Sequence, residues 1–307
     1  MNICILTHGK GKFIQGTTAS TRSLYRAAKA RGHNVRVINA ALCYIEVNSE
    51  TPKVLYEGED LSREFDVIIP RIMPSLTNYS NAILRQFEML GVYTTTKSIA
   101  IARSRDKFRS IQLLAKQGID IPRTIFSRET DKIDDLIEQI GVPVIIKLAK
   151  GTQGKGVVLA ETRKAAKSVI QAFYVLDTSI LLQEYIEESG GSDIRAFVVG
   201  SKVVASMERR SVTDDFRSNI HQGGEGVAIQ LTDEERKIAI RAAKAMGLQV
   251  CGVDMLRSSR GPLVIEVNAN PGLEGIERVT GKDVAMRIVE YVENNAKQRN
   301  RKDRVGA

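Results

Sequence analysis

The chain has 307 residues, of which 43% are hydrophobic and 26% are charged, so it is long enough for two or three packed units of ordinary globular composition. The formal net charge is +9, yet aromatic residues make up only 5% and tryptophan is absent, which argues against direct recognition of nucleic acid. No apolar run approaches the ~20 residues of a membrane span, and the three cysteines lie far apart without a CxxC pair. These features predict a cytoplasmic protein with no membrane contact, no disulfide and no zinc site.

Residues 1–97 alternate between apolar strand patterns and helical patterns, which indicates a parallel sheet with helices on its faces. The expected strands and helices, in chain order, are Ile3–Leu6, Thr21–Arg31 (helix), Val35–Ile38, Asp66–Ile69, Asn81–Leu90 (helix) and Val92–Thr94. The loop after the first strand contains glycines but no GxGxxG sequence, so nothing there predicts dinucleotide binding.

The next segment, Ser98–Gly118, is predicted to form a helix whose capping residue is Ser104. Lys107 lies in the first turn of this helix. A cation is unfavourable near the N-terminal end of a helix dipole, so Lys107 differs from an ordinary surface lysine.

A glycine-rich hairpin is predicted at Val142–Leu159. An apolar strand ends at Lys147, a loop spans Gly151–Gly156, and a second strand follows at Val157–Leu159. The Walker pattern is absent, but the backbone N–H groups of such a loop can surround phosphates, and Lys147 can reach a phosphate from the adjoining strand. The alternative interpretation is a flexible hairpin tip.

The following segment contains several more expected elements. A helix at Thr162–Phe173 precedes an apolar strand, Ile180–Ile186, that turns polar near its end, as strands at the rim of a pocket often do. The remaining expected elements are a hairpin of Asp193–Val199 with Lys202–Met207, a polar loop at Asp214–Gly226, and helices at Thr232–Met246 and Asp283–Ala296.

A second hairpin, Val250–Leu256 with Leu263–Asn268, is predicted to turn near Ser259 and to place Asp254 opposite Glu266 or within one residue of it. Alternation along the second strand sends Leu263, Ile265 and Val267 to one face and Val264, Glu266 and Asn268 to the other. Two carboxylates and a carboxamide on one face suit a hard cation such as Mg²⁺. The alternative is a strand face that is simply wetted by solvent.

Five stretches together resemble the RimK family of the ATP-grasp superfamily, and the resemblance runs over about residues 1–290. They are LRQFEMLG (Leu84–Gly91), SIAIARSRDKFRSIQLLAKQGID (Ser98–Asp120), GTQGKGVVLAET (Gly151–Thr162), DFRSN (Asp215–Asn219) and EVNANPGLEGIE (Glu266–Glu277).

The resemblance implies a fold of α/β and α+β class, namely an ATP-grasp fold with an N-terminal parallel α/β (pre-ATP-grasp) domain. The implied units are the N-terminal domain 1–97, a central subdomain 98–187 with the glycine-rich loop, a C-terminal subdomain 188–293 with the metal site, and a basic tail 294–307. The tail either attracts acidic partners or is a solvated terminus.

The resemblance also implies roles for individual residues. Lys107 and Lys147 are expected to contact ATP phosphates under the loop that contains Gly151, Gly154 and Gly156. The adenine, the ribose and the acyl-phosphate site are expected to be lined by Glu184 and Tyr185, by Asp193, and by Arg217, Ser218 and Asn219, respectively. Asp254, Glu266 and Asn268 are expected to hold two Mg²⁺ or Mn²⁺ ions. Arg195, Arg209 and Arg217 are the expected catalytic arginines.

The activity implied by the resemblance is ATP-dependent addition of L-glutamate to the C-terminal tail of ribosomal protein six of the small subunit, through an acyl phosphate, by an enzyme that forms a homo-oligomer. One alternative is glutamate addition to a small-molecule coenzyme, and another is a non-enzymatic ribosome- or RNA-binding protein, which only the net charge supports. The loop Lys10–Ala19 lies in the domain expected to touch the acceptor, so it bears on which carboxylate is used.

Overall fold

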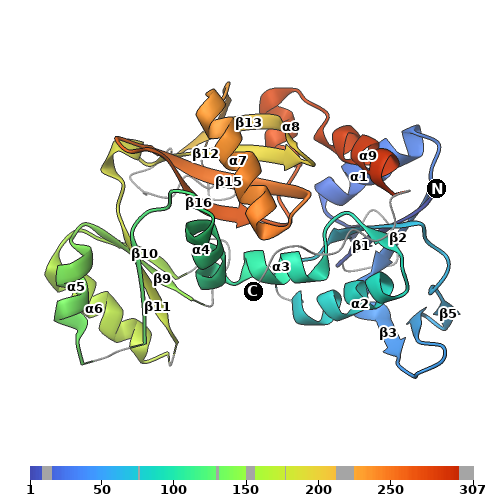
Figure 1. The fold of residues 1–307 in the computed structure, drawn as a ribbon, viewed down its shortest axis with the longest axis horizontal. Coiled ribbons are helices and arrows are strands. Elements are labelled where there is room, and N and C mark those ends of the chain that lie inside the picture. The colour runs from blue at the N-terminus through green and yellow to red at the C-terminus, as the bar shows by residue number, and fades with distance from the viewer. Residues whose placement is uncertain are drawn as a thin grey trace.

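The computed structural model describes residues 1–8, 16–74, 77–128, 131–149, 156–176, 178–211 and 225–296. Figure 1 shows an N-terminal group of elements (blue to teal), a central group (green to yellow-green) and a C-terminal group (yellow to red). The central group lies at one end of the molecule, and the C-terminal sheet lies between it and the N-terminal group (Figure 1).

The N-terminal group contains the predicted parallel sheet, with strand order β2-β1-β6-β7. Its strands and helices are β1 (Asn2–Thr7), α1 (Ala19–Ala30), β2 (Asn34–Asn39), β6 (Val67–Arg71), α2 (Thr77–Met89) and β7 (Tyr93–Thr94). Strand β1 is paired with β2 on one side and with β6, which comes later in the chain, on the other side. The order of the sheet therefore reverses between β1 and β6, the kind of position where open α/β sheets bind ligands.

A small antiparallel sheet follows β2 and was not predicted. Its strands are β3 (Cys43–Glu46), β4 (Lys53–Tyr56) and β5 (Glu59–Asp60). These strands are two to four residues long, and both residues of β5 are charged and exposed. The segment therefore shows little of the alternation between apolar and polar residues that marks a strand in a sequence.

The segment after β7 forms two helices, α3 (Ser98–Arg105) and α4 (Lys107–Lys116), with a break at Asp106. The Asp106 carboxylate accepts a hydrogen bond of 3.0 Å from the backbone N–H of Arg109 and caps α4. The prediction that Ser104 is the cap is wrong, because its hydroxyl bonds to the carbonyl of Ile101 within α3. Lys107 is the first residue of α4, as the sequence predicted to within one turn.

The central group is a four-stranded antiparallel sheet, order β10-β9-β11-β8, covered by two helices. Its elements are β8 (Thr124–Ser127), α5 (Ile133–Ile140), β9 (Val144–Leu148), β10 (Val157–Ala160), α6 (Arg163–Tyr174) and β11 (Ile180–Glu184). The predicted hairpin is confirmed, with Val157 paired to Lys147.

The C-terminal group is an antiparallel sheet of order β14-β13-β12-β15-β16 with helices packed on it. Its elements are β12 (Ser192–Val199), β13 (Lys202–Arg210), β14 (Glu225–Ala228), α7 (Asp233–Met246), β15 (Val250–Ser258), β16 (Gly261–Asn268), α8 (Glu274–Thr280) and α9 (Val284–Asn295). Among the described residues, no helix is long and apolar enough to cross a membrane.

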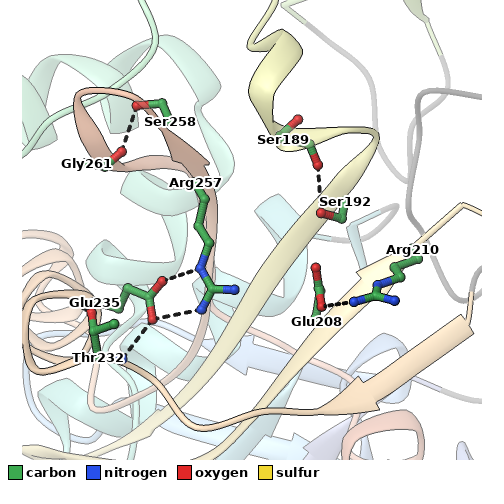
Figure 2. A network of polar contacts seen from close by, with 9 residues as sticks. All are labelled: Ser189, Ser192, Glu208, Arg210, Thr232, Glu235, Arg257, Ser258 and Gly261. Carbon is green, nitrogen blue, oxygen red and sulfur yellow. Dashed lines mark hydrogen bonds and ion pairs between the residues drawn. The ribbon is translucent and has the colours of Figure 1, made fainter.

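The start of α7 is tied to β15 through one buried carboxylate. The Thr232 hydroxyl and the Glu235 carboxylate form a capping box, and Glu235 also accepts a hydrogen bond of 2.7 Å from Nε of Arg257 (Figure 2). Ser258 closes the β15–β16 turn by donating to the carbonyl of Gly261 at 2.7 Å (Figure 2). These contacts fix the hairpin that carries the predicted metal ligands.

The N-terminal and C-terminal groups share their hydrophobic cores, whereas the central group has a core of its own. One shared cluster joins Leu6 and Phe87 to Val253, and the other joins Leu24 of α1 to Val289 of α9. Helices α1 and α9 lie side by side (Figure 1). The third cluster is built only from α5, α6 and the central sheet. The C-terminal sheet is therefore packed firmly on the N-terminal group.

Candidate active site

The β15–β16 hairpin brings the predicted oxygen ligands together. Asp254 pairs directly with Glu266, and Gly252 pairs with Asn268, which confirms the predicted register. The register shifts between Asp254 and Met255, which pairs with Val264, so Ile265 is an extra residue in β16. Such a bulge reverses the alternation, and the predicted grouping of Val264 with Glu266 is wrong: Val264 and Val267 share one core cluster.

Asp254 is buried beneath two arginines. Its carboxylate accepts hydrogen bonds from Nε and Nη2 of Arg195 at 2.7 and 2.6 Å, and Nη2 of Arg209 lies 2.9 Å away. Burial acts to raise the pKa of Asp254, but the two guanidinium groups outweigh it and lower that pKa to about 2. Asp254 is therefore an anion at neutral pH.

Arg209 also makes a bidentate pair with Asp193, with both contacts at 2.6 Å. Arg209 is 3% exposed and Asp193 is 8% exposed, so this pair is closed to solvent. The four side chains form one network of alternating charge across β12, β13 and β15. The catalytic roles of Arg195 and Arg209 and the ribose contact of Asp193 stay predictions. Each of these groups bonds here to another member of the network.

Glu266 differs from its neighbour Asp254 because it is exposed and no described residue donates a hydrogen bond to it. Loss of hydration and the negative charge of Asp254 raise the pKa of Glu266, and the nearby cations Arg195, Lys147 and Arg209 only partly offset them. A cation that binds beside Glu266 would therefore stabilise the charged form of this carboxylate.

Two lysines from other segments lie near enough to this carboxylate to act on it electrostatically. The ammonium of Lys147, at the end of β9, donates to Oε1 of Gln183 at 2.6 Å, and that of Lys107 donates to the carbonyl of Leu148 at 3.0 Å. Burial lowers the pKa of Lys147 to about 8, Glu266 opposes this shift and Lys107 adds to it. The pKa of Lys107 is also lowered by burial. The structure thus brings Lys107, Lys147 and Glu266 close enough for their charges to act on one another.

Glu184 and Tyr185 lie where β11 ends and the chain passes to the C-terminal group. The Glu184 carboxylate accepts a hydrogen bond of 2.7 Å from the backbone N–H of Arg123 and an ion pair from Arg260 in the β15–β16 turn. Glu184 therefore links the central group to the hairpin that carries Glu266. The predicted contact of Glu184 and Tyr185 with adenine stays a prediction.

Part of the predicted site lies outside the described residues. This holds for Gly151, Gly154, Arg217, Ser218 and Asn219, for most of the Lys10–Ala19 loop, and for most of the basic tail. Gly156 is described, and it needs to be glycine for two reasons: its φ is +72°, and a Cβ would lie 2.6 Å from Cδ1 of Leu148.

Two family models together cover nearly the whole chain. The RimK PreATP-grasp domain matches residues 1–101, and the RimK-like ATP-grasp domain matches residues 104–292. The chain belongs to the RimK family of ATP-grasp enzymes. It is accordingly an ATP-binding ligase that forms a C–N bond, as the resemblance implied.

Relatives in this family are similar over at least nine-tenths of their length. The "Probable alpha-L-glutamate ligase" of Pseudoalteromonas translucida is 55% identical over 297 residues, which is 96% of each chain. That of Nitrosococcus oceani is 58% identical over 278 residues, which is 90% of this chain and 92% of the relative.

Solved structures show the same fold at low sequence identity. The ATP-grasp ligase PsnB, complexed with minimal precursor, Mg and ADP, has a TM-score of 0.73 at 18% identity, over 96% of this chain and 98% of that one. The D-alanine–D-alanine ligase of Bacillus anthracis has a TM-score of 0.70 at 16% identity, over 97% and 98% of the two chains.

The residues present fit a divalent cation, the metal that the RimK family implies. Asp254, Glu266 and Asn268 offer only oxygen ligands, which Mg²⁺ and Mn²⁺ prefer, and the pair of carboxylates directly opposite each other gains from a cation between them. No group of three or more His, Cys, Asp or Glu side chains suited to a metal occurs in the described part of the chain. The proposed site does not conflict with that finding, because it has only two carboxylates and its third ligand is the amide of Asn268.

Sequence reasoning missed two arginines that lie near this site, Arg71 and Arg105. Arg71 ends the strand Val67–Arg71, whose other four residues are apolar and buried. A charged residue at the carboxyl end of a buried parallel strand is a signal that the sequence contains, and it could have placed Arg71 among the candidates.

Proposed function

We propose that this RimK-family enzyme joins the amine of L-glutamate to a carboxylate acceptor and uses ATP to activate that carboxylate. The observation that carries the proposal is the convergence of Lys107 and Lys147 on Glu266, next to its strand partner Asp254. The amine substrate is taken from the names of the relatives, which are 55% to 58% identical over at least 90% of both chains.

The chemistry follows from the weakness of a carboxylate as an electrophile. The γ-phosphoryl group of ATP is transferred to a carboxylate oxygen, which gives ADP and an acyl phosphate. The amine nitrogen then attacks the carbonyl carbon, the C–O bond to phosphate breaks, and an amide, inorganic phosphate and a proton are released. Such chemistry needs positioning and charge stabilisation more than a nucleophilic side chain.

The proposed residue roles are those that the resemblance to the RimK family implies. Lys107 and Lys147 contact phosphate oxygens, and the loop with Gly151, Gly154 and Gly156 covers them. Glu184 and Tyr185 contact adenine, Asp193 the ribose, and Arg217, Ser218 and Asn219 the transferred group. Arg195 and Arg209 hold a phosphate or a carboxylate. A pair of Mg²⁺ or Mn²⁺ ions at Asp254, Glu266 and Asn268 would neutralise phosphate charge during transfer.

The acceptor that we propose is the C-terminal carboxylate of ribosomal protein six of the small subunit, as the resemblance implies. Structures of the same fold solved with precursor peptides support a peptide as the class of acceptor. The second candidate is a small-molecule coenzyme carboxylate. We also propose a homo-oligomer, which light scattering of the purified protein would test.

The deciding experiment supplies purified protein with ATP, Mg²⁺ and L-glutamate and offers each acceptor separately. The proposal predicts glutamate-dependent release of ADP and an acceptor peptide whose mass increases by whole glutamyl residues. Glutamylated coenzyme with unchanged peptide would select the second candidate. If ADP release does not depend on glutamate with any of the acceptors, glutamate ligation is rejected.

A further inference from the structure

The carboxyl edge of the N-terminal parallel sheet faces the loop that follows the metal-ligand strand. The order of this sheet reverses between β1 and β6, and these strands end at Thr7 and Arg71. Ser20 of α1 accepts a hydrogen bond of 2.9 Å from the backbone N–H of Leu273, so the loop after β16 lies against this edge. A ligand at the reversal point would therefore touch both the N-terminal sheet and the metal-ligand strand.

Arg71 is a buried cation with unused hydrogen-bonding capacity. It is 7% exposed, its Nη2 donates to the carbonyl of Pro271 at 2.9 Å, and its buried Nε has no acceptor. Among the described residues, no carboxylate forms an ion pair with it. Burial lowers the pKa of Arg71 to about 10, and no acid offsets this shift. A buried guanidinium without an anion is costly, so its retention calls for a ligand.

Arg105 is a second, partly buried cation close to Arg71. Its guanidinium donates to the hydroxyl of Thr77 and to the carbonyl of Ile72, the residue that follows Arg71. Burial lowers the pKa of Arg105 to about 10 as well, and in the described part of the chain it has no carboxylate partner. The carbonyl of Ile72 also accepts from Nδ2 of Asn270 at 2.9 Å, which leaves the buried Oδ1 of Asn270 without a donor.

This group contacts the segment that directly follows the proposed metal ligand Asn268. Pro271 follows Asn268 by three residues, so their Cα atoms are at most about 11 Å apart. The side chain of Pro271 also lies against Gly252, the strand partner of Asn268. A Cβ at that glycine would be 3.1 Å from Pro271 Cβ and 3.4 Å from Arg195 Nε, so the backbone leaves room for both.

We propose that Arg71 and Arg105 bind a carboxylate of the amino acid whose amine attacks the acyl phosphate. This inference rests on the glutamate ligation proposed above. The acceptor's reacting carboxylate becomes the acyl phosphate and belongs with the metal ligands and lysines. The incoming glutamate instead carries two carboxylates that remain anions throughout, and these need permanent cations. Arginine suits them because its planar guanidinium matches a carboxylate with two parallel N–H groups.

The test uses Arg71→Lys and Arg105→Lys, which keep the charge and remove the forked geometry. Loss of a hydrogen bond to a charged group predicts a rise of roughly ten- to a hundred-fold in the KM for L-glutamate, with the KM for ATP unchanged within about two-fold. The matched control is Arg287→Lys, an exposed arginine on α9 paired with Glu290, which should change neither KM. L-glutamine and L-isoglutamine, tested as substrates, show which of the two carboxylates is bound.

A binding measurement without turnover completes the test. L-glutamate should raise the Tm of the wild-type protein and leave that of Arg71→Lys unchanged. A purely structural role of Arg71 would instead lower the resting Tm and raise the KM for ATP and glutamate alike. The inference is overturned by an unchanged KM for glutamate in both variants, by a rise in the KM for the acceptor in its place, or by a wild-type Tm that ignores glutamate. A different result would separate the two proposals. If L-glutamate raises the Tm of the wild-type protein but not of Arg71→Lys, and the wild-type protein never ligates glutamate, then the proposed function is rejected and the binding site is retained.

Discussion

Two clusters of charge lie side by side in this protein and differ in how they are paired. In the arginine–aspartate network, Asp254 and Asp193 each accept two hydrogen bonds from a guanidinium, and all four groups lie on adjoining strands. In the lysine–glutamate cluster, Lys107, Lys147 and Glu266 come from three segments, and the pKa of each is shifted toward its neutral form. The charged groups of the first cluster are paired with one another, whereas no described residue donates a hydrogen bond to Glu266 of the second, which we call the open cluster.

The largest expected effect is a loss of stability when the arginine–aspartate network is broken. Arg209→Leu leaves Asp193 and Asp254 buried without their shared cation, and removal of one partner of a buried pair costs about 3–5 kcal/mol of the free energy of unfolding. Urea denaturation measures it. The neighbouring residue supplies the matched control: Arg210 pairs with Glu208 on the surface (Figure 2), and Arg210→Leu should cost less than about 1 kcal/mol. Equal losses in the two variants would contradict the structural role of the network.

Glu266→Gln should affect activity and not stability. It removes a charge from the open cluster and also its repulsion with Asp254, so kcat should fall at least about 100-fold while the Tm stays the same or rises slightly. Steady-state ADP release and thermal unfolding measure the two quantities. The exposed Glu274 on α8 provides the control substitution, Glu274→Gln. Full activity in Glu266→Gln would remove this residue from the metal site.

Lys147 gives the open cluster a pH dependence. Its pKa in the folded protein, about 8, lies below the ordinary lysine value, so the charged form is disfavoured by folding. The resulting cost in stability is complete below pH 8 and disappears as the pH rises from about 8 to 10.5. Lys147→Met should therefore stabilise the fold at pH 7 while weakening ATP binding.

The same pKa predicts how ATP binding responds to pH. The KM for ATP should be level below pH 8 and should increase above it, as Lys147 loses its charge. In Lys147→Arg the guanidinium stays protonated, so the increase should vanish whatever the absolute KM becomes. An identical rise in this variant would assign the titration to another group.

The smallest expected effect lies outside both clusters and calibrates the others. Thr232→Ala removes the capping hydroxyl of α7 and should cost about 1 kcal/mol, measured by urea denaturation, with turnover unchanged. Thr232→Ser should restore most of that stability, because serine is an equally good cap. A loss of activity in Thr232→Ala would show that the α7 cap, which holds Arg257 through Glu235, also positions the open cluster.

Much of this architecture was predictable because periodicity and turn residues mark the longer elements. The parallel N-terminal sheet, the glycine hairpin and the pairing of Asp254 with Glu266 all followed from local patterns. The bulge at Ile265 did not, since one extra residue leaves no mark in an alternating strand. The cap at Asp106 was misassigned to Ser104, because both residue types are good caps and only the backbone decides between them.

The partners of charged side chains were the least predictable feature. Nothing local shows that Asp193 bonds to Arg209, sixteen residues away, or that Glu184 bonds to Arg260 across a boundary between groups. Arg105 was missed for the same reason, since its significance depends on its having no carboxylate partner among the described residues, whereas Arg71 carried a local signal at the end of its strand. Long-range register, and not composition, determines which charges are paired.

The central claim is that the open cluster activates a carboxylate by phosphorylation before the amine attacks. An acceptor whose C-terminal carboxylate carries a heavy isotope of oxygen tests this directly, with mass spectrometry of the released phosphate. The account predicts that each new amide bond transfers one acceptor oxygen to phosphate in the wild-type protein. Amide formation with no label in the phosphate would contradict it.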